Sequence, residues 1–261
     1  MDELPRPIPP HDAHVHTVRS DGADTVAAMV RAAEAVGLDS IAITDHVDAA
    51  TTDLQERVAE IRRIAARSTV AVIPGAELRI LDARGQLALP PRGLDQVRLV
   101  LAGLTAQTTG IAEGVPADRG RLVDSIFAAY AAVVESEHVD VIANPLNLGR
   151  FPAPLTPEEL PRAYIRDLAR LMADREVALE LAATAWWWHP ELALGEFVRQ
   201  WVALLRVFAH EGVKFVAGSN AHCPAAVGNN HFTRRIMRLS GIELSQVVNL
   251  RGLAARERRR R

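Results

Sequence analysis

The sequence predicts an α/β barrel of about seven parallel strands, and three observations support this fold class. Short apolar segments alternate with longer amphipathic segments along the chain, with no long linker between them. Polar side chains of the kinds that bind metals follow several of the apolar segments. The 261 residues, 49% of them hydrophobic, can form one large core. We therefore expect a single barrel domain that covers residues 1–261.

Each expected element follows from a local pattern. A strand begins at His11 and runs into a loop, because its side chains alternate in character. The expected helices have apolar residues at helical spacing and are residues 25–36, 53–67, 120–136, 157–174, 194–210, 233–239 and 244–255. The further strands are residues 40–43, 70–73, 97–102, 139–143, 177–181 and 214–217. Gly85 marks a hairpin within residues 78–89.

The two ends of the chain differ from the body in composition. Residues 1–10 are rich in proline, and we expect them to wrap the outside of the domain. Residues 251–261 carry six arginines and one glutamate, so the formal net charge of −2 leaves the body of the chain acidic. An acidic body argues against a surface that binds nucleic acid. The basic tail could contact phosphates, but a solvated terminus is the simpler interpretation.

Composition also indicates the cellular compartment of the protein. A single cysteine, Cys223, excludes a disulfide framework and favours the cytoplasm. No apolar run is long enough to span a bilayer, and the first residues lack the basic and apolar regions of a signal peptide. We expect a cytoplasmic protein without a membrane partner. Its oligomeric state is not predicted.

The first strand carries the strongest local signal. Asp12, His14 and His16 project from one face at a period of two. Two neighbouring imidazoles suit zinc, iron or manganese, although the pair alone fits a hydrogen-bonded histidine strand equally well. Asp12, one step deeper, is expected to hold a ring N–H of a ligand histidine.

Residues with metal-binding side chains recur at the carboxyl ends of the other predicted strands. They are Asp45, His46, Glu77, Asn144, Glu180, Asn220 and His222. Buried strands gain nothing from such groups, because an unpaired buried charge is costly. In a parallel barrel all of these ends meet at one rim. The sequence therefore predicts a metal centre there.

These motifs together resemble the PHP family, the polymerase and histidinol phosphatase metallohydrolases. The segments that carry the resemblance are His14-x-His16, Ser20-Asp21-Gly22, Ile43-Thr44-Asp45-His46, Pro74-Gly75-x-Glu77 and Gly218-Ser219-x-Ala221-His222. The resemblance extends from about residue 11 to residue 230 and points to the small stand-alone phosphatase-like branch. It implies a distorted (β/α)7 barrel, similar to a TIM barrel.

The resemblance also implies up to three metal ions. His14, His16 and Glu77, with the position of Asn220, would form a first site. A second site would use Asp21, His46 and His222. A third would combine Glu77 with two histidines, whose positions are occupied here by Thr105 and Asn144.

Three positions therefore depart from the family pattern. Threonine and asparagine are weak neutral ligands, so we expect the third site to be empty and the chain to hold one or two zinc, manganese or iron ions. Asn220 stands where the family has aspartate and lacks the negative charge. The catalytic residues that the resemblance implies are Glu77, Asp45 and Asn220.

Three rim residues are candidate substrate contacts. Arg79 and Arg150 could fork onto a phosphate, and Trp186 could stack on a sugar or base. For Trp186 and the next two tryptophans, packing at the rim or contact with a partner are alternatives.

The favoured function is a metal-dependent hydrolase that acts on the phosphate ester of a small metabolite through metal-activated water. The alternative is a catalytically impaired PHP-fold pseudoenzyme with a binding or regulatory role. An accessory of a polymerase is disfavoured, because no polymerase domain follows the barrel.

Overall fold

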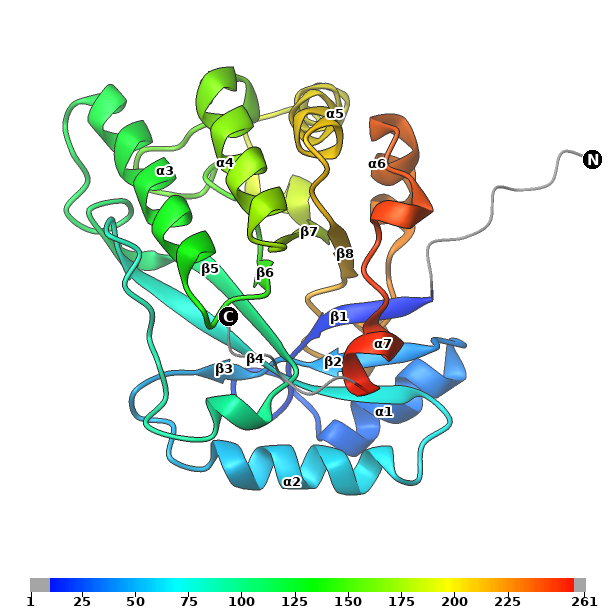
Figure 1. Cartoon of the computed structure of the whole chain (residues 1–261). Coiled ribbons are helices and arrows are strands. Elements are labelled where there is room, and N and C mark those ends of the chain that lie inside the picture. The colour runs from blue at the N-terminus through cyan, green and yellow to red at the C-terminus, as the bar shows by residue number, and fades with distance from the viewer. Residues whose placement is uncertain (1–9, 256–261) are drawn as a thin grey trace, which may run out of the picture.

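Parallel strands form the centre of the molecule, and helices surround them (Figure 1). The computed structural model describes residues 10–255. The strands are β1 (His11–Val15), β2 (Ser40–Ile43), β3 (His46–Val47), β4 (Ala71–Asp82), β5 (Leu99–Thr109), β6 (Val141–Ile142), β7 (Ala178–Ala182) and β8 (Phe215–Gly218). Seven of them follow the order β1-β2-β4-β5-β6-β7-β8, and the two-residue β3 pairs with β4.

The first and last strands come together and nearly close the sheet. Val15 at the end of β1 pairs in parallel with Ala221, just beyond β8. The amide of His16 donates to the carbonyl of Ala221 at 2.8 Å. The predicted barrel of seven parallel strands is thus confirmed.

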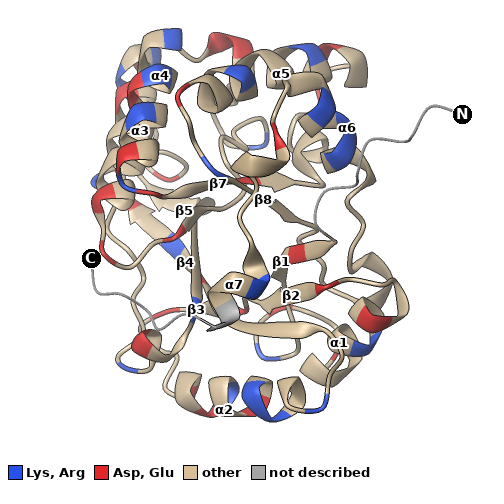
Figure 2. Cartoon of the chain, turned by 45° about the vertical axis from the view of Figure 1, so that its right-hand side comes forward, with Lys and Arg blue, Asp and Glu red and all other residues tan. Residues whose placement is uncertain are grey.

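Helices cover the outside of this barrel. They are α1 (Val26–Ala35), α2 (Leu54–Ala65), α3 (Arg119–Glu135), α4 (Arg162–Asp174), α5 (Leu194–His210), α6 (His231–Ser240) and α7 (Leu250–Ala255). The side chain of Thr25 caps α1 by accepting from the amide of Ala28, and Asp118 caps α3 through the amide of Arg121. Charged residues are frequent on these outer helices, as expected for amphipathic elements with one solvent face (Figure 2).

The inside of the barrel has its own small hydrophobic core, and the strands that form it orient the side chains of the site. It contains Ala13, Ala42, Ile73, Leu101, Val141, Ala178, Val216 and Leu250. Residues two and four positions apart on a strand share a face. Glu77 therefore lies on the same face of β4 as Ile73, and Glu180 on the same face of β7 as Ala178. Both carboxylates therefore point into the barrel.

Some element boundaries differ from the sequence prediction. Strand β4 continues to Asp82, because it pairs with β5 from Gly75–Leu99 as far as Asp82–Thr109. The hairpin at Gly85 is present, since Leu87 pairs back antiparallel with Ile80. The predicted helix over 157–174 is split into the 3₁₀ helix η2 (Pro157–Glu159) and α4, which starts after Pro161. Proline lacks an amide hydrogen and cannot continue the ladder. The predicted helix over 244–255 is likewise split into the 3₁₀ helix η5 (Leu244–Gln246) and α7.

The expectations for the two termini fall largely outside the described residues. They concern the proline-rich segment 1–10, of which only residue 10 is described, and most of the basic segment 251–261. Within residues 10–255, none of the helices combines the length and the hydropathy needed to cross a bilayer.

Candidate metal centre

Four side chains from three parts of the chain converge at the carboxyl end of β1. Nε2 of His14 and Nε2 of His16 lie only 3.0 Å apart. One oxygen of Glu77, Oε2, lies 3.1 Å from Nε2 of His14 and 3.4 Å from Nε2 of His16. The Oδ1 atom of Asn220 lies 3.1 Å from Nε2 of His16. The structure thus brings together the residues predicted for the first metal site, all of them buried except Asn220.

A second group lies beside the first and is more open to solvent. Asp21 is its centre: its Oδ2 atom lies 3.2 Å from Nε2 of His222 and 3.5 Å from Nε2 of His46. These are the residues predicted for the second site. The structure adds His16, whose Nδ1 atom lies 3.5 Å from Oδ1 of Asp21. His16 therefore faces both groups with its two ring nitrogens, a role that sequence spacing could not reveal.

His46 lies between the two groups. Its Nδ1 atom is 3.2 Å from Oε2 of Glu77, and its Nε2 atom faces Asp21. The ring of His16 stacks on that of His222, with centroids 4.4 Å apart. This crowding of imidazoles around two carboxylates fits a cluster of cations better than a set of ordinary hydrogen bonds.

The electrostatics of the cluster favour a neutral His16, an ionised Glu77 and a positive charge near His14. Burial lowers the pKa of His16 to about 3, and the charge of His14 contributes, so the ring is neutral at pH 7. Burial alone would raise the pKa of Glu77, but His14 and the other histidines hold it at about 2. For His14, the carboxylates of Glu180 and Glu77 outweigh the effect of burial and raise its pKa. The space between His14 and Glu77 therefore favours a positive charge.

The donor set fits bound divalent ions in two places. His14, His16 and Glu77 form one group whose ligand atoms all lie within 4.8 Å of one another, and His16, Asp21 and His222 form another. The buried Nδ1 atom of His16 has no hydrogen-bond partner among residues 10–255. Because a neutral imidazole has a single lone pair, His16 can ligate an ion in one of the two groups at a time. Imidazole and carboxylate ligands suit zinc and related metals.

The positions of the third family site do not fit an ion. The hydroxyl of Thr105 accepts from the amide of Gln107 at 3.3 Å. The Oδ1 atom of Asn144 accepts from the side-chain amide of Asn147 at 3.2 Å. The side chain of Thr105 is thus engaged within β5 and that of Asn144 within the loop after β6, and no third ligand group occurs in the described part of the chain.

The contacts of Asp12 correct one expectation. Its carboxylate accepts from the amide and hydroxyl of Ser219, at 2.9 and 2.5 Å, and from the amide of Gly228 at 2.9 Å. It therefore fixes the loop that follows β8 and does not hold a histidine ring. The ring nitrogen Nδ1 of His14 instead lies 2.8 Å from Glu180. The position of Glu180 at a strand end was visible in the sequence, but its partner was not.

Asp45 anchors the loop after β1. Its Oδ1 atom accepts from the amide of Thr17 and the hydroxyl of Ser20, both at 2.7 Å, and Oδ2 accepts from the hydroxyl of Thr17 at 2.8 Å. This loop delivers Asp21 to the cluster. Asp45 thus anchors the loop that carries the ligand Asp21. The catalytic role expected for Asp45 stays a prediction.

The predicted substrate contacts occupy the same end of the barrel. Arg79, two residues after Glu77 on β4, contacts Asp48 and Gln107. The guanidinium of Arg150 lies 3.7 Å from the ring centroid of Trp187, and its Nε donates to the carbonyl of Trp187. Trp186, in the 3₁₀ helix η3 (Ala185–Trp188), is 45% exposed. Their role in substrate binding stays a prediction.

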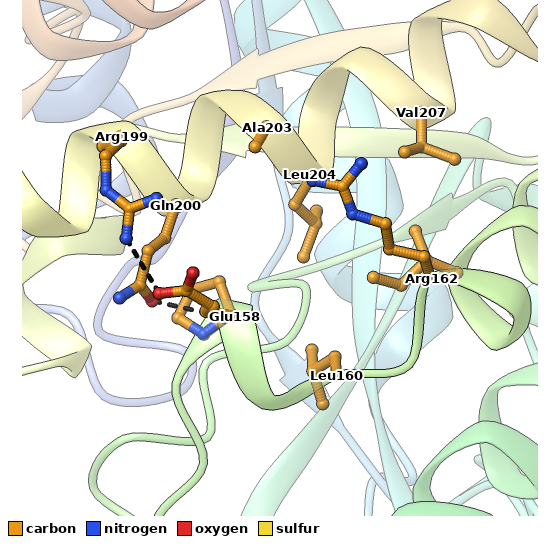
Figure 3. Close-up of a pocket in the computed structure, with 10 residues that line it drawn as sticks. Glu158, Leu160, Arg162, Arg199, Gln200, Ala203, Leu204 and Val207 are labelled. Carbon is orange, nitrogen blue, oxygen red and sulfur yellow. Dashed lines mark hydrogen bonds and ion pairs between the residues drawn. The ribbon is translucent and has the colours of Figure 1, made fainter.

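A surface pocket of about 300 Å³ lies elsewhere, between η2, α4 and α5 (Figure 3). Leu160 and Leu204 contribute apolar surface, and Glu158 pairs with Arg199 at 2.8 Å. None of the candidate metal ligands lines this pocket.

The fold and the site define a parallel α/β barrel with a cluster of histidines and carboxylates at the carboxyl ends of its strands. The PHP domain family matches residues 12–184, so the chain belongs to the PHP family. A comparison with curated proteins found no match.

Several solved structures share the fold. Histidinol phosphate phosphatase from Lactococcus lactis, solved with zinc, L-histidinol and phosphate, is 17% identical with a TM-score of 0.66 over 89% of this chain and 94% of that one. A putative histidinol phosphatase from Listeria monocytogenes is 14% identical, with a TM-score of 0.57 over 85% and 99%. A chain of an archaeal ribonuclease P with mature tRNA is 13% identical, with a TM-score of 0.50 over 88% of each chain.

Proposed function

We propose that the protein is a metal-dependent phosphoesterase that hydrolyses the phosphate ester of a small metabolite. The observation that carries this proposal is the convergence of His14, His16 and Glu77 with Asp21 and His222 at one end of the barrel. Family membership and the fold shared with histidinol phosphate phosphatase support it. In such clusters, divalent ions stabilise phosphoryl oxygens and lower the pKa of water.

The residues of the cluster would have different roles in holding the metal ions. Glu77 is ionised at neutral pH and contacts three histidines, so it holds the two ligand groups together. Asn220 contributes a neutral amide oxygen and cannot accept a proton in the reaction. One or two zinc, manganese or iron ions per chain would be held by these groups. A cytoplasmic location is part of the proposal and rests on the single cysteine.

Binding of the substrate is assigned to the rim. Arg150 lies over the ring of Trp187 and donates its Nε–H to the Trp187 carbonyl, and its remaining N–H groups could fork onto a phosphate. Trp186 offers an exposed aromatic side chain. Arg79, which contacts Asp48 and Gln107, would bind the substrate from β4.

A second candidate function is a pseudoenzyme that binds a ligand or partner. The observation that favours it is the replacement of three expected ligands by Thr105, Asn144 and Asn220, which leaves the cluster with fewer charges. The two candidates share the metal centre and differ in turnover.

One experiment separates them. The purified protein is loaded with manganese or zinc, its metal content is measured, and hydrolysis of p-nitrophenyl phosphate is followed with and without chelator. A phosphoesterase shows chelator-sensitive turnover that is lost when His14→Ala and His16→Ala are combined. About one or two equivalents of metal with background turnover, also on a panel of phosphorylated metabolites, support the pseudoenzyme. Failure to bind metal contradicts both.

A further inference from the structure

Glu180 is a fully buried carboxylate that the proposed chemistry does not use. It lies on β7, and its exposed fraction is 0%. Its Oε1 atom is 2.8 Å from Nδ1 of His14, and Oε2 accepts from the amide of Asn144 at 2.6 Å. No lysine or arginine pairs with it within residues 10–255. A buried carboxylate without such a partner is costly, so its two hydrogen-bond donors must hold it in place.

Gly218 provides the room for this contact. A Cβ atom at position 218 would lie 2.1 Å from Oε1 of Glu180 and 2.8 Å from Cβ of His14. The backbone of Gly218 is part of β8 and does not adopt a positive φ, so a side chain is excluded by space and not by conformation. The glycine of the segment Gly218-Ser219-Asn220 therefore has an explanation in the contact between His14 and Glu180.

We propose that Glu180 is a positioning residue for the metal centre. It accepts the Nδ1–H proton of His14, which fixes the ring so that the lone pair of Nε2 faces Glu77 and His16. Its second oxygen ties this contact to the start of the loop after β6, at Asn144. The inference rests on the metal binding in the proposed function but not on turnover.

Glutamine at position 180 cannot replace both contacts. Its single carbonyl oxygen can accept from His14 or from the amide of Asn144, and its NH₂ group then faces the other donor. If the NH₂ group faces His14, it donates to Nδ1 and moves the ring proton to Nε2. The proton then occupies the nitrogen that would bind the metal. If it faces Asn144, two donors meet. In both arrangements the orientation of His14 is weakened while the shape of the side chain is kept.

The test compares Glu180→Gln with Glu135→Gln, a control on the exposed end of α3. Affinity for zinc is measured by chelator competition, and the cobalt-substituted proteins are compared by their visible absorption. The circular dichroism of the metal-free proteins reports the fold. We expect Glu180→Gln to bind zinc about 10- to 100-fold more weakly with an altered cobalt spectrum, because partners of ligand histidines have effects of this size. Glu135→Gln should match the wild type.

A second variant reaches the same contact without changing charge. In Gly218→Ala the new methyl group crowds both Oε1 of Glu180 and Cβ of His14 and disturbs their contact, and we expect a loss of zinc affinity. Nitrogen NMR of the zinc-loaded wild type provides a readout that needs no variant: His14 should carry its proton on Nδ1 and lack one on Nε2.

The outcomes are distinct. Wild-type zinc affinity in folded Glu180→Gln, or a His14 ring protonated on Nε2, overturns the positioning role. If both variants fail to fold, the NMR result alone decides. A wild-type protein that binds no zinc contradicts the proposed function itself.

Discussion

The two sides of the barrel rim differ sharply in their polar side chains. On the side of β1, β3, β4 and β8, histidines and carboxylates from five chain segments point at one another within hydrogen-bond distance. On the side of β5 and β6, Thr105 bonds within its own strand and Asn144 within the loop after β6. Both sides rest on the same continuous sheet. One part of a barrel rim can thus lack metal ligands while the strands beneath it stay intact, because rim side chains contribute little to the core.

The largest expected effect comes from removing the carboxylate of Glu77, which links the two ligand groups. Glu77→Gln keeps the shape of the side chain but removes the charge that faces His14, His16 and His46. We expect zinc affinity to fall by at least about 100-fold, more than for the partner of a ligand. Equilibrium dialysis with metal analysis measures it. Unchanged metal content in this variant would show that the ions, if bound, lie elsewhere.

A gain of charge on the same side is expected to strengthen binding. Asn220→Asp changes the shape of the side chain little, and asparagine and aspartate both tolerate the positive φ of 55° at this position. An added carboxylate near the cations is worth about 1–4 kcal/mol at intermediate dielectric, which corresponds to a tenfold or greater gain in affinity. Chelator competition checks the gain. Turnover measured in parallel should rise if the protein is a weakened hydrolase and stay at background if it is a pseudoenzyme.

Introducing histidines at positions 105 and 144 tests why that side of the rim has no metal site. Thr105→His combined with Asn144→His, in the background of Asn220→Asp, is expected to raise the metal content by up to about one equivalent per chain. Metal analysis of the dialysed protein gives the number. An unchanged content would mean that the backbone of β5 and of the loop after β6 holds positions 105 and 144 away from Glu77. In that case the backbone conformation, and not only the residue type, distinguishes the two sides.

A last expected effect lies at the other end of β1 and concerns the stability of the fold, not metal binding. Burial lowers the pKa of His11 to about 4, and its Nε2 atom accepts from the amide of Ala217 at 3.0 Å. The unfolded chain takes up this proton near pH 6.5, so stability that is present above pH 6.5 is lost as the pH falls towards 4. The loss is about 3 kcal/mol.

Urea unfolding of the metal-free protein at several pH values measures this loss. In His11→Gln the decrease in unfolding free energy between pH 6.5 and 4 should be smaller than in the wild type. His138→Gln, at a partly exposed histidine outside β1, should leave the decrease unchanged. Equal pH dependence in all three proteins would show that His11 does not stay neutral in the fold.

The fold class and the residues that meet at the rim follow from the sequence alone. Periodicity located helix 194–210 to the residue, and the ends of parallel strands must share one edge, so the sequence places His14, His46, Glu77 and His222 together. Residue type alone marked Thr105 and Asn144 as weak ligands.

Only the tertiary structure decided which atoms face one another. The bonding of Asp12 to Ser219, the contact of Glu180 with His14 and the position of His16 between two ligand groups depend on side chains from strands far apart in sequence. Spacing along one strand gives the face of a side chain but not its rotamer or its neighbour across the barrel. The extension of β4 to Asp82 had the same origin, because pairing with β5 overrode the hydrophobic pattern. The split of helix 157–174 at Pro161 is instead a local effect of proline, which is visible in the sequence.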